Sequence, residues 1–171
     1  GISLPDAAEA LAKVPAVPGR MEPVPAPGLG CRIFIDFAHT PDAMENALKT
    51  ARSMTSGRLI AVFGCGGGRD PGKRPLMGAA AGQYADLTVL TSDNPRTEDP
   101  LAIIRDILPG LSGPHLVIPD RREAIFRALD LARPGDTVIL CGKGHEITQE
   151  TGGHRLPMDE RQIIAEYING S

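Results

Sequence analysis

The sequence predicts an α/β fold in which a doubly wound, mostly parallel sheet is flanked by helices. Five short runs are mostly apolar, and a segment with helical periodicity separates each from the next. Strands of this composition are buried on both faces, as in a parallel sheet covered by helices. We therefore expect a Rossmann-like architecture. Its core should be aliphatic, because aromatic residues make up only 4% of the chain.

The first half of the chain alternates strand and helix. Strands are expected at residues 32–37, 58–63 and 87–91. Thr40 is suited to cap the first helix, with Pro41 at its first position, and Gly57 ends it. The inward face of this helix is expected to contain Met44, Ala47, Leu48, Ala51 and Met54. A second helix should begin near Pro75 and direct inward Leu76, Met77, Ala80 and Tyr84.

The second half continues the alternation. Asp99 and Pro100 start a helix whose apolar residues are Leu101, Ile104, Ile107 and Leu108. A strand at 115–118 follows, and then Asp120 with Glu123 resembles a capping box for a helix that reaches Ala132. After a strand at 137–141, Asp159 is suited to cap a last helix that carries Ile163, Ile164, Tyr167 and Ile168.

The first thirty residues differ from the rest. Residues 6–14 could form a short alanine-rich helix, and five prolines fall within residues 15–27. Such a segment is typical of a semi-rigid, extended linker. We expect residues 1–30 to be a linker from a preceding domain, and residues 31–171 to form the folded domain.

Composition excludes several classes of function. A chain of 171 residues with a net charge of -3 is expected to be one domain without a basic footprint for nucleic acid. No apolar run approaches the roughly 18–20 residues of a membrane span. The three cysteines are odd in number and lack zinc spacing, which indicates reduced thiols and no metal site. We expect a cytoplasmic monomer, with Cys65 and Cys141 as small buried side chains.

The stretch GCGGGRDPGKRP, residues 64–75, resembles two phosphate-binding motifs and fits neither. A Walker A motif needs Ser or Thr after its Lys to ligate magnesium, but Arg74 follows Lys73. A dinucleotide fingerprint that begins at Gly64 has Arg69 where its last glycine should stand. The loop is therefore expected to serve a different ligand.

Charged residues and glycines gather in the loops that follow the expected strands. These loops meet at the carboxyl edge of the sheet, where α/β proteins bind ligands. They carry Asp36, His39, Asp93, Asn94, Arg96, Lys143, His145 and Glu146. An arginine can hold a carboxylate or phosphate through two hydrogen bonds, and a nearby acid can hold an ammonium group. This edge suits a small ligand with charges of both signs.

Some of these residues have structural interpretations as well. Asp36 could cap the next helix, and Asp93 to Pro95 could form a plain turn. Arg96 has no role in a turn, so it is the informative residue of that loop. Arg121 and Arg122 are expected on the surface, at the start of their helix.

Five motifs together resemble the C-terminal domain of the Mur ligase family. In chain order they are GRME, DFAHTPDAM, FGCGGGRDPGKRPLMG, SDNPRTEDP and CGKGHE. The resemblance covers the chain from about Arg20 to the end. It is nearest to the branch of the family that adds meso-diaminopimelate, because DNPR resembles the recognition motif for that amino acid. Lysine-adding relatives usually carry another residue at the position of Arg96.

The resemblance implies a reaction and a set of site residues. The family uses ATP and Mg²⁺ to phosphorylate a carboxylate of UDP-MurNAc-L-Ala-D-Glu, and an amine of meso-diaminopimelate then attacks the acyl phosphate. The implied amino-acid site comprises Arg69, Asp93, Asn94, Pro95, Arg96, Gly142 and Glu146. The implied ATP contacts are Arg20, Asp36 and His39, with Asp36 accepting from ribose hydroxyls. Lys73 would lie near the reacting phosphates. Pro71 stands where some relatives have a basic residue.

The family keeps its Walker A motif and magnesium ligands in a central domain, and its nucleotide-sugar pocket in an N-terminal one. We therefore expect this chain to be inactive alone and to meet UDP-MurNAc-dipeptide through those other domains. Specificity for L-lysine or another amino acid stays open, and so does a stand-alone amino-acid or nucleotide-binding module. Because lysine lacks one carboxylate, it would leave Arg96 unpaired. Sites of this kind discriminate by roughly 10⁴-fold or more.

Overall fold

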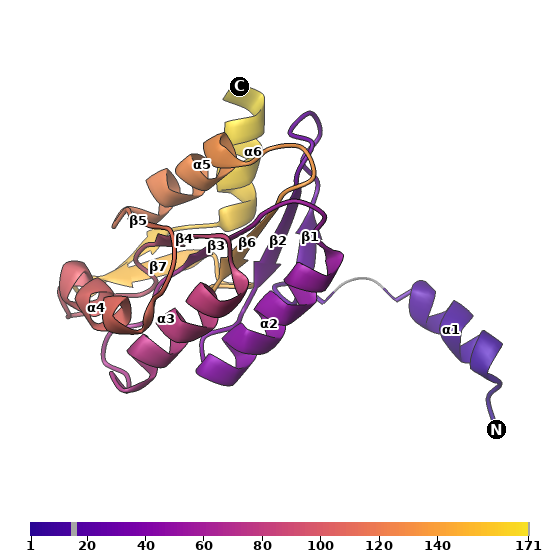
Figure 1. The fold of residues 1–171 in the computed structure, drawn as a ribbon, viewed down its shortest axis with the longest axis horizontal. Helices are drawn as coiled ribbons and strands as arrows, with labels where there is room; N and C mark the ends of the chain where they lie inside the picture. The colour runs from indigo at the N-terminus through magenta and orange to yellow at the C-terminus, as the bar shows by residue number, and fades with distance from the viewer. Residues whose placement is uncertain (15–16, 171) are drawn as a thin grey trace.

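A six-stranded sheet forms the centre of the molecule, and the computed structural model describes residues 1–14 and 17–170. The strand order is β1-β2-β6-β3-β4-β5, and β1 alone runs antiparallel to its neighbour (Figure 1). The strands are β1 (Glu22–Val24), β2 (Arg32–Asp36), β3 (Leu59–Phe63), β4 (Leu87–Leu90), β5 (His115–Val117) and β6 (Thr137–Cys141). The predicted strands are confirmed to within one residue at each end.

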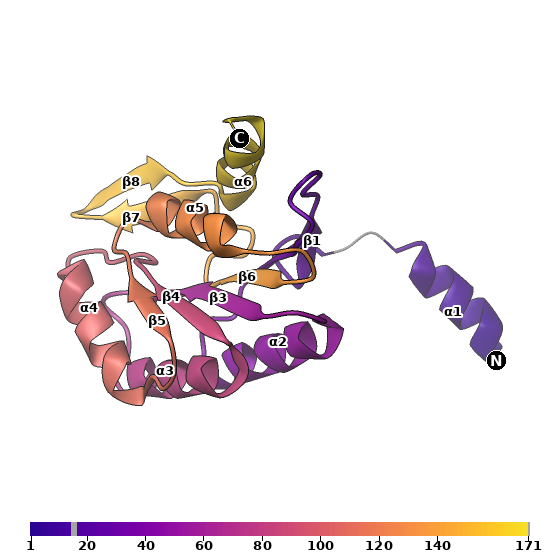
Figure 2. The ribbon, with the colours of Figure 1, turned by 45° about the horizontal axis from the view of Figure 1, so that its top comes forward.

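Helices cover both faces of the sheet, so the doubly wound prediction is confirmed (Figure 2). One face packs against α2 (Pro41–Met54), α3 (Lys73–Tyr84) and α4 (Pro100–Ile107), which the 3-10 turn Leu108–Gly110 extends. The other face packs against α5 (Arg121–Leu131) and α6 (Glu160–Gly170). Thr40 caps α2 by accepting a hydrogen bond from the backbone of Ala43, as its position predicted.

Helix α3 departs from the expected pattern. It begins at Lys73, two residues before Pro75, and Leu76 is 58% exposed, so the prediction that Leu76 faces inward is wrong. The buried face carries Met77 and Ala80, as predicted, together with Arg74, which was not predicted. Arg74 is drawn inward by ion pairs with Glu98, at 2.9 Å, and with Asp106, at 2.8 Å. The spacing of apolar residues does not predict which face of a helix is buried when ion pairs draw a charged side chain inward.

Part of the proline-rich segment belongs to the sheet. Glu22 to Val24 form β1 and pair with residues 33–35 of β2. Farther upstream, α1 (Leu4–Ala12) stands apart from the body of the molecule, and Ser3 caps it (Figures 1 and 2). Pro15 and Ala16 of the expected linker lie outside the described residues.

A small antiparallel hairpin follows the last sheet strand and was not predicted. It consists of β7 (Thr148–Thr151) and β8 (His154–Pro157), joined by Gly152 and Gly153. Its residues are half-buried or exposed, so they lack the apolar run on which the strand predictions depended.

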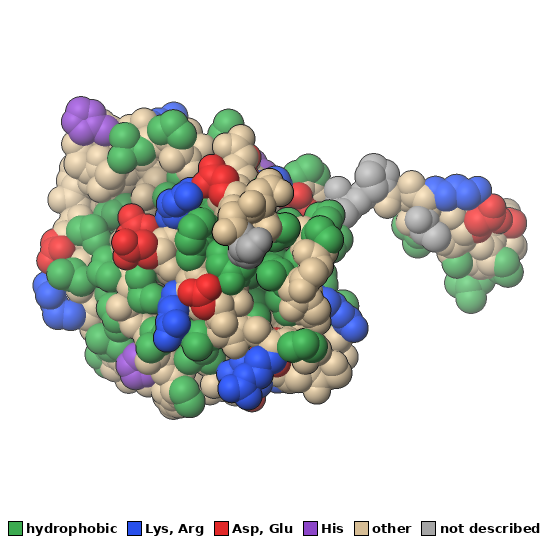
Figure 3. Space-filling model, turned by 90° about the horizontal axis from the view of Figure 1, so that it is seen from above, with side chains coloured by type: hydrophobic (Ala, Val, Ile, Leu, Met, Phe, Trp, Pro, Cys, Tyr) green, Lys and Arg blue, Asp and Glu red, His purple; other side chains and the backbone are tan. Residues whose placement is uncertain are grey.

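The surface mixes charges of both signs. Figure 3 shows acidic and basic side chains interspersed with apolar ones on one face. Among the described residues, no helix has the length and apolar character needed to cross a membrane.

Two leucines test the assignment of buried and exposed helix faces. Leu48 on α2 is fully buried, so Leu48→Ala should lower the free energy of unfolding by about 2–5 kcal/mol. Leu76→Ala on α3 should change it by no more than about 0.5 kcal/mol, because Leu76 is exposed. Urea denaturation measures both. Equal losses would contradict the placement of α3.

Candidate ligand-binding site

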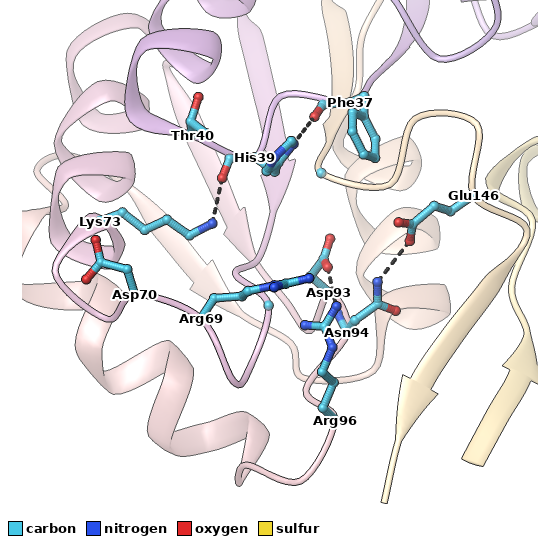
Figure 4. A pocket seen from close by; sticks show the side chains of 12 residues that line it. Phe37, His39, Thr40, Arg69, Asp70, Lys73, Asp93, Asn94, Arg96 and Glu146 are labelled. Atoms are coloured by element: carbon cyan, nitrogen blue, oxygen red, sulfur yellow. Dashed lines mark hydrogen bonds between the residues drawn. The ribbon is translucent and has the colours of Figure 1, made fainter. Parts of the chain in front are cut away.

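A pocket of about 410 Å³ opens at the carboxyl edge of the sheet (Figure 4). Its walls come from the loops after β2, β3, β4 and β6. Eight of the residues predicted for the site line this pocket: His39, Arg69, Lys73, Asp93, Asn94, Arg96, Gly142 and Glu146. Sequence reasoning missed four other lining residues, Phe37, Thr40, Gly66 and Asp70, although all four lie within the quoted motifs. Loops distant in the sequence therefore converge as expected.

Arg69 and Arg96 reach the same pocket from different loops (Figure 4). Arg69 is exposed and makes no hydrogen bond or ion pair with the described part of the chain. Arg96 is half-buried: its Nη1 donates to the carbonyl of Gly67 at 2.7 Å, and its Nε lies 3.3 Å from Glu150 Oε2. Much of the donor capacity of the two guanidinium groups remains available to a ligand.

The glycines of the 64–68 loop allow two backbones to touch. A Cβ on Gly64 would lie 2.1 Å from the carbonyl oxygen of Thr91, and one on Gly67 would lie 2.0 Å from that of Pro95. Real Cβ atoms do not approach oxygen so closely, so these positions require glycine. The backbone N–H of Gly67 also donates to the carbonyl of Asn94 at 2.9 Å. The 64–68 loop thus supports the 91–96 segment. This contact explains why the loop is rich in glycine, and no phosphate ligand is needed to explain it.

A buried network joins Asn94 to the loop after β6. Lys143 is fully buried, and its Nζ donates to Asn94 Oδ1 at 3.0 Å and to Glu146 Oε2 at 3.1 Å. Asn94 Nδ2 donates to the same Glu146 oxygen at 2.9 Å. Burial raises the pKa of Glu146, but the hydrogen bonds from Asn94 and Lys143 outweigh burial and hold this pKa below its ordinary value. Glu146 therefore presents a carboxylate to the pocket at neutral pH.

Asp93 lies at the base of the pocket and is buried. Its Oδ1 accepts from the backbone of Asn94 at 2.7 Å, whereas Oδ2 has no hydrogen-bond partner among the described residues. A Cβ on Gly142 would lie 2.5 Å from Oδ2, so glycine is needed beside it. An unsatisfied buried carboxylate oxygen is unusual and is an acceptor for an ammonium group or a water molecule.

Arg121 lies beneath the pocket, and the prediction that it is a surface residue is wrong. It is fully buried and forms an ion pair with Glu160 of α6 at 2.7 Å. Its Nη1 donates to the carbonyl of Ser92 at 3.1 Å, and its Nη2 donates to that of Cys141 at 2.9 Å. Arg122 is exposed as expected and pairs with Glu166.

Comparison with known proteins identifies the family. A family model described as "Mur ligase, glutamate ligase domain" matches residues 19–144. The chain belongs to the Mur ligase family.

Among the relatives of this Mur ligase chain, two bacterial UDP-N-acetylmuramoyl-L-alanyl-D-glutamate–2,6-diaminopimelate ligases are 51% identical to it. The Syntrophomonas wolfei enzyme aligns over 165 residues, 94% of this chain and 34% of its own length. The Aquifex aeolicus enzyme aligns over 168 residues, 97% of this chain and 34% of its own. The chain therefore spans about a third of the length of these relatives.

Solved structures agree with this assignment. The structure of a diaminopimelate ligase with the same name superposes with a TM-score of 0.85 at 42% identity, over 99% of this chain and 35% of the other. The Escherichia coli FolC structure in complex with ADP has a TM-score of 0.62 at 22% identity, over 85% of this chain and 33% of the other. The second likeness shows a shared fold.

Of the residues that the Mur ligase resemblance assigns to ATP, only His39 lines the pocket. Asp36 is buried beside it and accepts from the backbones of Met21, at 2.7 Å, and Ala38, at 2.8 Å. The guanidinium of Arg20 lies 5.1 Å from the centre of the Phe37 ring, which contacts the His39 ring edge-on. The contact of Asp36 with a ribose stays a prediction.

Three other residues discussed from the sequence are buried and do not line the pocket: Pro95, Cys65 and Cys141. Pro95 is buried, with its carbonyl against Gly67. Cys65 and Cys141 are free and buried, as expected, and burial raises the pKa of the Cys65 thiol to about 12. Groups of acids, histidines or cysteines placed to hold a metal ion do not occur among the described residues.

The Arg121–Glu160 pair provides a test of the pocket's support. Glu160→Ala would leave a buried guanidinium unpaired, so we expect the free energy of unfolding to fall by about 3–5 kcal/mol. Glu166→Ala removes the acid of the exposed Arg122 pair and should cost no more than about 1 kcal/mol. Guanidinium denaturation compares the two variants, and similar losses would refute this role for Glu160.

Proposed function

We propose that this chain is the amino-acid-binding domain of an ATP-dependent ligase. The proposed reaction adds meso-diaminopimelate to UDP-MurNAc-L-Ala-D-Glu during synthesis of cytoplasmic peptidoglycan precursors. The observation that carries this proposal is the convergence of Arg69 and Arg96 in one pocket that also holds Asp93 and Glu146. The names and 51% identity of the relatives support the same substrate class.

The charges of the pocket suit one end of this amino acid. Its lining carries three basic side chains, Arg69, Lys73 and Arg96, and three acidic ones, Asp70, Asp93 and Glu146. A carboxylate at the bound end would accept hydrogen bonds from the two arginines. The ammonium group at that end would face Asp93 and Glu146. The amine at the other end would then project from the pocket toward an acyl phosphate.

The same charges disfavour lysine. Lysine has an amine at the bound end but no carboxylate there. It would therefore bring a positive charge near Arg69 and Arg96 and would leave both arginines unpaired. The pocket would discriminate against lysine because lysine leaves the arginine side chains unpaired, and not because lysine is too large to fit. The lysine-specific alternative is therefore less consistent with this pocket than the diaminopimelate one.

Arg96→Ala tests the amino-acid assignment. The unchanged chain should bind meso-diaminopimelate in preference to L-lysine, and the variant should lose most of that preference because the carboxylate loses its partner. Isothermal titration calorimetry with each amino acid measures the two affinities. Arg105→Ala, an exposed change on α4, is the matched control and should leave both unchanged. The assignment would be refuted by an undiminished ratio of affinities in Arg96→Ala.

ATP use requires more than this chain. We infer that Arg20, Asp36 and His39 contact the nucleotide while the phosphates and Mg²⁺ are held by another domain. Closure of the two domains would complete the site, as in enzymes that assemble catalytic groups by domain motion. Lys73, whose Nζ donates to the carbonyl of His39 at 2.8 Å, is then placed to face the phosphates.

The dependence on other domains predicts that the 171-residue chain forms no ADP from ATP with meso-diaminopimelate and UDP-MurNAc-L-Ala-D-Glu. An assay coupled to ADP release checks this, with the Aquifex aeolicus relative as the positive control. ADP release by the chain alone would contradict the proposal that another domain holds the phosphates and Mg²⁺. If a chain supplied with the other domains bound the amino acid but formed no product, a stand-alone binding module would be favoured.

A further inference from the structure

The β7–β8 hairpin lies against the segment that carries Arg96. The match to the family model ends at residue 144, so the hairpin at 148–157 lies beyond it. We propose that this hairpin sets the conformation of Arg96 and thereby determines the amino-acid specificity of the pocket. The proposal rests on the proposed function, because it treats Arg96 as a group that contacts the ligand.

The backbone of Arg96 adopts a conformation that needs external support. Its φ is 56°, in the left-handed region that side chains other than glycine rarely occupy. Two hydrogen bonds to the hairpin hold it there. The N–H of Arg96 donates to the carbonyl of Glu150 at 2.9 Å, and the N–H of Gly152 donates to the carbonyl of Arg96 at 2.6 Å. Strained conformations persist where surrounding contacts enforce them, and they gather at ligand sites.

The hairpin also orients side chains of the 93–96 segment. Glu150 Oε2 lies 3.3 Å from Arg96 Nε, on the side of the guanidinium away from its bond to Gly67. The N–H of Glu150 donates to Asn94 Oδ1 at 2.9 Å, and Gln149 Nε2 donates to the carbonyl of Asp93 at 2.6 Å. Three residues of the proposed recognition segment are therefore held by β7.

The turn of the hairpin offers a way to perturb this support without touching the pocket. Gly152 and Gly153 have φ values of 56° and 77°, and a Cβ on either would meet no atom within 4 Å. Positive φ at both central residues is the pattern of a type I′ turn, in which Asn-Gly is favoured. A substitution at Gly152 therefore acts through backbone conformation alone, and Asn and Val should behave differently there.

The test compares Gly152→Val with Gly152→Asn. Valine strains the turn, so we expect roughly tenfold weaker binding of meso-diaminopimelate, the equilibrium effect of placing a side chain in the left-handed region. Binding of L-lysine should change less, so the ratio of affinities should fall. Asparagine tolerates this conformation and should bind as the unchanged chain does. His154→Ala, an exposed change in β8, is a second control.

Amide hydrogen exchange provides a readout independent of the ligand. The amide of Arg96 should exchange faster in Gly152→Val than in Gly152→Asn, while amides of β3 keep their protection and show that the sheet is folded. Equal affinities and equal selectivity in the two variants would overturn the role of the hairpin and leave the proposed function intact. An unchanged chain without preference for meso-diaminopimelate would overturn the proposed function, and this inference with it.

Discussion

The pocket depends on one buried cation, Arg121. Its guanidinium donates to the last carbonyls before two site loops, those of Ser92 and Cys141. Ser92 lies just after β4, and Cys141 is the last residue of β6. These two strands lie on either side of β3, so a single side chain fixes the spacing of two loops across a third strand. The charge can be buried because Glu160 neutralises it from α6. A helix near the end of the chain therefore contributes to the geometry of a pocket that it does not line.

The glycine-rich loop completes the arrangement by lying directly against the loop after β4. Contact between the two backbones at Gly64 and Gly67 leaves no room for side chains between them. The resulting sequence resembles a phosphate loop because both uses require glycine, although for different reasons. In a phosphate loop, glycine lets backbone N–H groups surround an anion, whereas here it lets one protein backbone support another.

Burial explains which parts of this structure could be predicted. Strands covered on both faces leave an unbroken apolar run, and β6 was predicted to the residue. Strand β1 and the hairpin are half-buried or exposed, so the same signal is absent there. The site loops were predictable because the carboxyl ends of parallel strands lie at the same edge of the sheet. The burial of Arg121 and Lys143 was not, because their partners Glu160 and Asn94 lie 39 and 49 residues away in the sequence.

The basic residues around the pocket divide into two groups, and this division shapes what the pocket can bind. Three of them are buried, and each forms an ion pair with an acid of the protein: Arg74, Arg121 and Lys143. Arg69 and Lys73 line the pocket without an acidic partner among the described residues, and Arg96 shares only its Nε with Glu150. The first group fixes the loops, so the second needs little reorganisation when an anion arrives. A carboxylate that enters meets N–H donors that are mostly not paired with an acid and whose positions are already set. Preorganisation of this kind increases affinity by lowering the entropic cost of binding.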